Sequence, residues 1–209
     1  MTHPSAHPDF WHQRWQSNQI GFHEGKPNPH LQRFMPALAP PGARVLVPLC
    51  GKTVDMAWLA EEGYAVVGVE LSEIACAAFF SERGLEPLRE QVGPYVRWSC
   101  GPVTLLQGDI FDLDDRFDGI WDRAALVALP PALRERYAAK MRACLRPGAA
   151  MLILTFVYDQ TRRDGPPFSV DDAALQALYP EAQRLFSQEI DEPRWRDLGG
   201  FAEVVWRVG

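Results

Sequence analysis

Three apolar runs between residues 44 and 107 end at or just before residues that could bind a nucleoside. "RVLVPL" is followed within three residues by Gly51 and Lys52, "AVVGVE" ends in Glu70, and a third run leads into Asp109. A carboxylate at the end of a strand can accept both hydroxyl protons of a ribose. Glu70 lies 19 residues after Gly51, close to the spacing of ~20 that this geometry uses. This combination favours a ligand that contains adenosine.

The loop at Gly51 is the wrong kind for a pyrophosphate. A dinucleotide loop needs three glycines as G-x-G-x-x-G, whereas "LCGKTVD" has one. In a nucleotide-triphosphate loop the first glycine would stand at position 46, which is Leu46, inside the predicted strand. S-adenosyl-L-methionine fits better, because it has one adenine, one ribose and an amino-acid tail. Gly51 would let the backbone approach that tail.

The elements that would position these residues alternate along the chain. The sequence predicts a buried strand over 44–49, a helix that ends at Gly63, and a second buried strand over 65–70. Ser72 then begins a helix that Gly84 closes. Strand, helix, strand and helix in this order are typical of a parallel sheet that is covered on both faces.

The second half adds further strands and finishes differently. The patterns predict a hairpin over 95–107, strands over 117–122 and 150–158, and a helix over 130–145 between them. The strand over 150–158 is the most apolar, so we expect it in the centre of the sheet. "RLFSQEI" and "FAEVVWRV" have no helix between them, which predicts antiparallel pairing. The fold class is therefore α/β, with about seven mostly parallel strands.

Two short helical patterns precede the first strand. Phe10, Trp11 and Trp15 recur at helical spacing after Asp9, which we expect to be the N-cap. "HLQRFMPAL" is the second pattern. We interpret residues 1–209 as one domain, with an N-terminal helical cap, or lid, over 9–40 and a Rossmann-like core over 41–209.

Several long blocks carry a resemblance to a known family. They are "WHQRWQSNQIGFHE", "VPLCGKTVDMAWLAEEGYAVVGVELSE", "IFDL", "WDRAALVAL" and "YDQTRRDGPPF". In this order they resemble the bacterial thiopurine S-methyltransferases, from about Phe10 to the C-terminus. The resemblance implies the class I methyltransferase fold. It also implies methyl transfer from S-adenosyl-L-methionine to the sulfur of aromatic and heterocyclic thiols, with S-adenosyl-L-homocysteine as product. Some bacterial members also methylate selenium and tellurium species.

The same resemblance implies the positions of the site residues. For the cofactor these are Trp15, Leu49, Glu70 and Arg123, with Asp109 and Ile110 near the adenine, and for the substrate they are Phe22, Arg123 and Arg194. Arg194 is preferred to Arg196 by its distance from the following glycines. We expect an in-line displacement without a strong general base, because heterocyclic thiols ionise readily. In this hypothesis Arg123 and Arg194 favour the anionic substrate, while Trp15 and Phe22 close the site.

Other interpretations stay open. Trp15 could be ordinary core packing, and Arg123 could pair locally with Asp122. His12, His23 and His30 share no helical face, so we expect no metal. The chain could methylate another small-molecule nucleophile, act as a nicotinamide-dependent oxidoreductase, or bind adenosine as a sensor without catalysis.

Composition restricts the partners. The formal net charge of −6 argues against a nucleic-acid binder, and no apolar run reaches the ~20 residues of a membrane helix. The four cysteines have no C-x-x-C spacing, so we expect small buried side chains in a reducing cytoplasm. The expected partner is a small-molecule thiol, and the expected state is a monomer.

Overall fold

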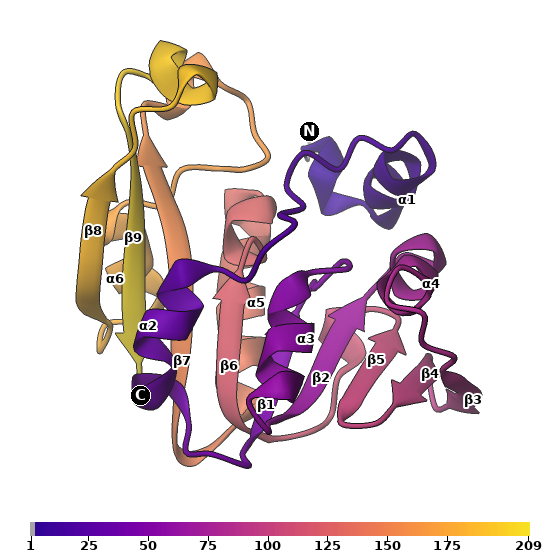
Figure 1. The fold of residues 1–209 in the computed structure, drawn as a ribbon. Helices are drawn as coiled ribbons and strands as arrows, with labels where there is room; N and C mark the ends of the chain where they lie inside the picture. Colours follow the sequence, from indigo (N-terminus) through magenta and orange to yellow (C-terminus); the bar gives the residue numbers. More distant parts are fainter. Residues whose placement is uncertain (1–2) are drawn as a thin grey trace.

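The computed structural model describes residues 3–209, whose strands form one nine-stranded sheet in the order β3-β4-β5-β2-β1-β6-β7-β9-β8 (Figure 1). The five strands from β5 to β7 in this order run parallel, and antiparallel strands extend both edges. The bounds are β1 (Arg44–Pro48), β2 (Ala65–Glu70), β3 (Leu88–Val92), β4 (Tyr95–Cys100), β5 (Val103–Gln107), β6 (Phe117–Arg123), β7 (Leu145–Tyr158), β8 (Gln183–Glu189) and β9 (Phe201–Val208).

Helices cover both faces of the sheet. Side chains of α2, α3 and α4 share one apolar cluster with the sheet, and those of α5 and α6 share another on the opposite face (Figure 1). The helices are α1 (Pro8–Gln16), α2 (Pro29–Leu38), α3 (Val54–Glu61), α4 (Glu73–Ser81), α5 (Pro131–Ala143) and α6 (Asp172–Leu178). Two layers of helices around a parallel centre confirm the predicted α/β class.

The sheet has more strands than the pattern predicted, and β7 lies elsewhere. β3 was missed because all five of its residues are exposed, so it carries no apolar alternation. β7 begins at Leu145, where the sequence predicted the end of a helix, and it lies between β6 and β9. The middle position belongs to β1. Long apolar strands need burial on both faces, and β7 gets this in any interior position.

The first helix begins two residues earlier than expected. His7 is the N-cap of α1 and Pro8 is its first residue, so Asp9 lies in the first turn. Proline suits this position, because its fixed φ angle matches the helix and its missing N–H would have had no partner there. Asp9 still has a favourable place near the positive end of the helix.

A buried carboxylate fixes the chain where α2 begins. Asp55 in α3 accepts hydrogen bonds from the backbone N–H of Asn28 at 2.7 Å and from Nε1 of Trp121 at 2.8 Å. The side chain of Asn28 in turn accepts from the N–H of His30 at 2.9 Å, as the N-cap of α2. This network joins the end of the N-terminal segment to α3 and β6.

In residues 3–209, no helix has both the length and the apolarity to cross a lipid bilayer.

Candidate active site

The site lies where the winding of the sheet reverses. From β1 the chain winds outward through β2 and β5, and it then returns to β6 on the other side of β1. Ligands of open α/β sheets bind beyond the carboxyl ends of the strands at this point. A cavity of about 660 Å³ lies there, within the range of roughly 300–1,000 Å³ that is usual for small-molecule sites. All nine predicted residues line it: Trp15, Phe22, Leu49, Gly51, Glu70, Asp109, Ile110, Arg123 and Arg194.

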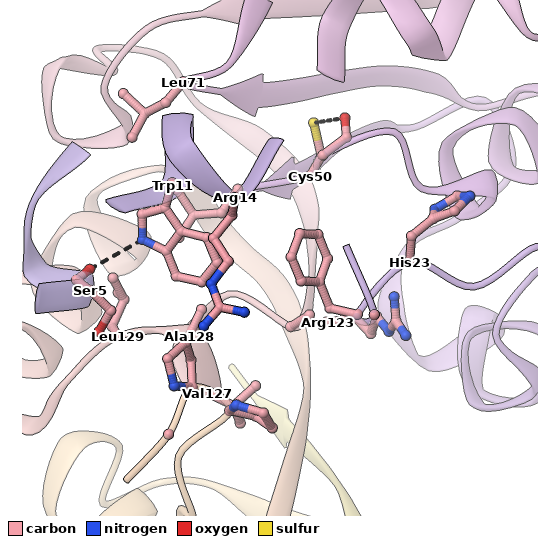
Figure 2. A pocket seen from close by; sticks show the side chains of 18 of the residues that line it. Ser5, Trp11, Arg14, His23, Cys50, Leu71, Arg123, Val127, Ala128 and Leu129 are labelled. Carbon is pink, nitrogen blue, oxygen red and sulfur yellow. Dashed lines mark hydrogen bonds between the residues drawn. The ribbon is translucent and has the colours of Figure 1, made fainter. Parts of the chain in front are cut away.

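Residues 8–27, the N-terminal cover, form one wall of the cavity. Figure 2 shows Trp11 and Arg14 of α1 beside side chains from the core. The ring of Phe22 lies edge-on to those of Trp11 and Trp15, with centroids 6.1 and 5.7 Å away. Trp15 is 6% exposed and also lines the cavity. Trp15 therefore packs in the core and forms part of the cavity wall at the same time.

The loop after β1 has an unusual backbone. Leu49 and Gly51 both have positive φ angles, of 46° and 54°. Residues other than glycine rarely adopt such angles. A Cβ atom on Gly51 would lie 3.0 Å from the Trp15 ring. The loop and the N-terminal cover therefore touch at a position where only glycine fits easily.

Substituting Gly51 tests this contact. We expect Gly51→Ala to lower the affinity for S-adenosylhomocysteine about tenfold, because backbone strain of about 1 kcal/mol adds to the displacement of Trp15. Gly63→Ala is the matched control, since Gly63 also has a positive φ, of 87°, but nothing within 4 Å of the added Cβ. Calorimetric titration gives the affinities. Equal effects of the two substitutions would contradict a role for the Trp15 contact.

Glu70 joins the loops after β1 and β2. Its carboxylate accepts the N–H of Gly51 at 2.9 Å and the N–H of Ser72, the N-cap of α4, at 2.8 Å. Burial raises the pKa of Glu70, and these backbone hydrogen bonds oppose the shift. Glu70 thus fixes the geometry of the cavity floor and also lines the cavity.

The residues that follow β5 form another part of the cavity wall. The side chain of Asp109 accepts the N–H of Phe111 at 2.9 Å and begins a short helix at Ile110, which is buried. The guanidinium of Arg136 lies over the Phe111 ring, 3.8 Å from its centroid. This places a flat apolar surface and a carboxylate together at the cavity wall.

Arg123 ends β6 and forms an ion pair across the cavity. Its Nη2 lies 2.6 Å from Oε1 of Glu24 in the N-terminal cover, and its side chain is 10% exposed. Its Nε is buried and has no hydrogen-bond partner. The local pair with Asp122 that the sequence left open is absent from the described structure, because Asp122 points to the other face of the sheet. There it accepts the N–H of Leu126 at 3.0 Å and the hydroxyl of Tyr137 at 2.8 Å.

The buried Asp122 carboxyl makes stability depend on pH. Burial raises its pKa from 3.8 to about 6, so between these values the folded chain binds more protons than the unfolded chain. This contribution is complete below the unfolded pKa and is lost as the pH rises through about 6. We expect Asp122→Asn to gain stability relative to the native chain across this range, by up to about 3 kcal/mol. Urea unfolding at several pH values measures the difference, and a constant difference would contradict it.

Arg194 lies at the rim of the cavity. It belongs to η5 (Pro193–Leu198), its side chain is 56% exposed, and its Nε lies 2.7 Å from Glu192. The neighbouring Trp195 stacks on Phe201 with centroids 4.3 Å apart. Arg196 is 63% exposed and pairs with Asp191. Of these two arginines in the described structure, Arg194 is the one that lines the cavity.

The wall also contains charged groups that the sequence did not predict, among them Glu24 and Glu203. Glu24 is the partner of Arg123, and Glu203 on β9 pairs with His30 at a distance of 3.0 Å. Burial, followed by the charge of Lys52, lowers the pKa of His23, which also lines the cavity. Lys52 itself pairs with Glu82. A sequence pattern has no signal for Glu24, because the contact joins a loop to a strand end far along the chain.

Cys50 is a further wall residue, and its thiol is buried. Burial, together with the nearby Glu70, raises the pKa of its thiol well above the usual value. A thiol in such surroundings is a poor nucleophile. Cys50, Cys76 and Cys144 are buried and Cys100 is half-buried, which matches the expected small buried side chains for the first three.

Comparison with known proteins places this chain in a family. Residues 6–205 match the family described as thiopurine S-methyltransferase. The thiopurine S-methyltransferase of Pseudomonas entomophila is 52% identical over 177 residues, which cover 82% of each chain. That of Azotobacter vinelandii is 49% identical over 214 residues, which cover 97% of this chain and 98% of the relative.

Solved structures share the fold at low identity. The 1,6-didemethyltoxoflavin-N1-methyltransferase of Burkholderia thailandensis, solved with S-adenosylhomocysteine, has a TM-score of 0.64 at 20% identity and covers 96% of this chain and 86% of its own. The magnesium protoporphyrin IX methyltransferase of Synechocystis PCC 6803, also solved with S-adenosylhomocysteine, has a TM-score of 0.64 at 11% identity and covers 97% and 99%. The fold is thus that of S-adenosylmethionine-dependent methyltransferases, and the chain belongs to the thiopurine S-methyltransferase family.

Proposed function

We propose that this protein transfers the methyl group of S-adenosyl-L-methionine to the sulfur of an aromatic or heterocyclic thiol and releases S-adenosyl-L-homocysteine. Family membership supports the reaction, and the S-adenosylhomocysteine in two structural neighbours supports the cofactor. The observation that carries the proposal for this chain is the cavity itself. It brings a buried carboxylate at the end of β2 and an arginine with an unused donor at the end of β6 into one space.

The residues of the cavity floor suit the cofactor. Glu70 is a buried acceptor at the strand end where a ribose diol would bind. The backbone at Gly51 has no side chain in the way of an amino-acid tail, and Ile110 offers an apolar surface beside the Asp109 carboxylate for an adenine. When bound, the cofactor supplies both the electrophilic methyl group and the leaving group.

The chain itself would bind and orient the thiol. The guanidinium of Arg123 favours the thiolate over the thiol, since a nearby positive charge stabilises the anionic form. The positive charge of Arg194 at the rim of the cavity also favours the thiolate. Because Arg194 is exposed, it is better placed to attract the anionic thiol than to contact it directly. Trp15 and Phe22, which belong to the N-terminal cover, exclude water from the cavity. Alignment of the sulfur with the methyl group then lowers the barrier by proximity, and an already ionised thiol needs no general base.

A single assay tests the proposal. The protein is incubated with S-adenosylmethionine carrying a labelled methyl group, and with thiophenol or mercaptopurine as acceptor. We expect labelled thioether and one equivalent of S-adenosylhomocysteine. Calorimetric titrations with S-adenosylhomocysteine and with a nicotinamide dinucleotide accompany the assay. Binding without transfer to any thiol would favour the sensor, and binding of the dinucleotide alone would favour the oxidoreductase.

The N-terminal cover should respond to the cofactor. We expect its backbone amides to gain hydrogen-exchange protection when S-adenosylhomocysteine is added, because Trp15 and Phe22 line the cavity from that segment. The apolar face of α2 is buried against the sheet, so this helix is an internal control whose exchange should change little. Mass spectrometry of peptic fragments measures both segments. Unchanged exchange in the cover would contradict its role as a lid.

A further inference from the structure

The ion-pair partner of Arg123 is itself a carboxylate. Glu24 lies between α1 and α2, in a stretch without helix or strand, and its Oε1 is 2.6 Å from Nη2 of Arg123. In residues 3–209 it is the one carboxylate that pairs with this arginine. The positive charge proposed to bind the substrate is therefore matched by a carboxylate of the chain itself.

The two side chains differ in how firmly they are held. Arg123 is 10% exposed, whereas Glu24 is 36% exposed and lies on a loop. The carboxylate can thus rotate into water, but the guanidinium stays in the cavity. A guanidinium has five N–H donors, and the Nε of Arg123 is buried without a partner. The arginine can therefore accept a second anion beside Glu24 or in its place.

We propose that Glu24 determines substrate specificity by competing with the substrate sulfur for Arg123. This inference rests on the proposed function and deepens it. An anionic sulfur brings the charge needed to take the place of Glu24, which then moves into solvent. A neutral thiol is a weak acceptor, so its binding cannot compensate a buried arginine that has lost its counter-charge. The site therefore prefers thiols that are already ionised when they arrive.

The test compares charged and neutral ligands in Glu24→Gln. The ionised substrate is para-nitrothiophenol, at a mildly alkaline pH at which it is a thiolate. The neutral ligand is its S-methyl product, para-nitrothioanisole, used as a competitive inhibitor. We expect KM for the thiolate to fall about five- to tenfold, because a glutamine holds Arg123 less strongly than a carboxylate. The inhibition constant of the thioether should change less than twofold, as should the Kd for S-adenosylhomocysteine.

The matched control is Glu90→Gln. Glu90 also forms an ion pair with an arginine, Arg97, but on the β3–β4 edge, away from the residues that line the cavity. Its KM values should equal those of the native chain. Glu24→Ala provides a second variant, in which we expect the same direction of change without any remaining hydrogen bond to Arg123.

Two results would overturn the inference. One is an unchanged or increased KM for the thiolate in both Glu24 variants, which would make Glu24 a residue that positions Arg123. The other is an equal decrease for thiolate and thioether, which would point to a steric effect rather than a charge effect. Neither result touches the proposed function. That proposal fails only if the native chain methylates no thiol at all, and the same measurements include this test.

Discussion

Glu70→Ala lowers the affinity for S-adenosylhomocysteine about 100-fold, and this is the largest effect on cofactor binding that we expect. The substitution removes the acceptor proposed for the ribose. It also leaves the backbone N–H groups of Gly51 and Ser72 without their partner. A lost hydrogen bond to a charged group, or a buried donor without a partner, costs about 1–3 kcal/mol, and 100-fold corresponds to about 2.7 kcal/mol.

The measurement is a calorimetric titration of the variant and two controls. Glu70→Gln retains the volume and one acceptor oxygen, so it should lose less affinity than the alanine variant. Glu73→Ala, at the first residue of α4, removes an exposed carboxylate that pairs with Arg89, and it should bind like the native chain. If Glu70→Ala binds within threefold of the native chain, Glu70 is only a structural link between the two loops.

Arg123→Ala has the largest expected effect on turnover. We expect kcat/KM for a thiol to fall about 30- to 100-fold, while the Kd for S-adenosylhomocysteine changes by less than about threefold. The variant loses the charge that stabilises the thiolate, and charged hydrogen bonds of this kind contribute about 2–3 kcal/mol.

Steady-state kinetics with a labelled methyl donor measure this effect. Arg123→Lys retains the charge and should recover part of the activity, but a point charge cannot reproduce the planar donors of a guanidinium. Arg97→Ala, at the β3–β4 edge, removes an arginine from an exposed ion pair and is the control. If thiol turnover is unchanged in Arg123→Ala, the residue has no role in activating the substrate.

The parts of the site that follow from strand periodicity could be predicted. Leu49, Glu70 and Asp109 each follow an apolar run, and parallel strands place their carboxyl ends along one edge. The same pattern predicted the helices on both faces. The sequence could not give the backbone conformation at Leu49, because nothing in its side chain favours a positive φ.

What could not be predicted depends on contacts between distant segments. Glu24 became part of the site only through the fold, since it meets Arg123 across 99 positions of sequence. β3 is visible only from its pairing with β4, because all five of its residues are exposed and they show no apolar alternation. Within "IGFHE" the sequence pointed to Phe22, whereas Glu24 is the residue that forms the ion pair with Arg123.

The buried Asp55 network sets limits on how the active site can open. Asp55 is 2% exposed and holds Asn28 and Trp121 together, so an opening motion that leaves it intact has its hinge at Asn28. The moving flap then ends before α2, and it carries Trp15, Phe22 and Glu24 as one unit. One motion of this segment would both break the ion pair between Arg123 and Glu24 and open the cavity to the cofactor.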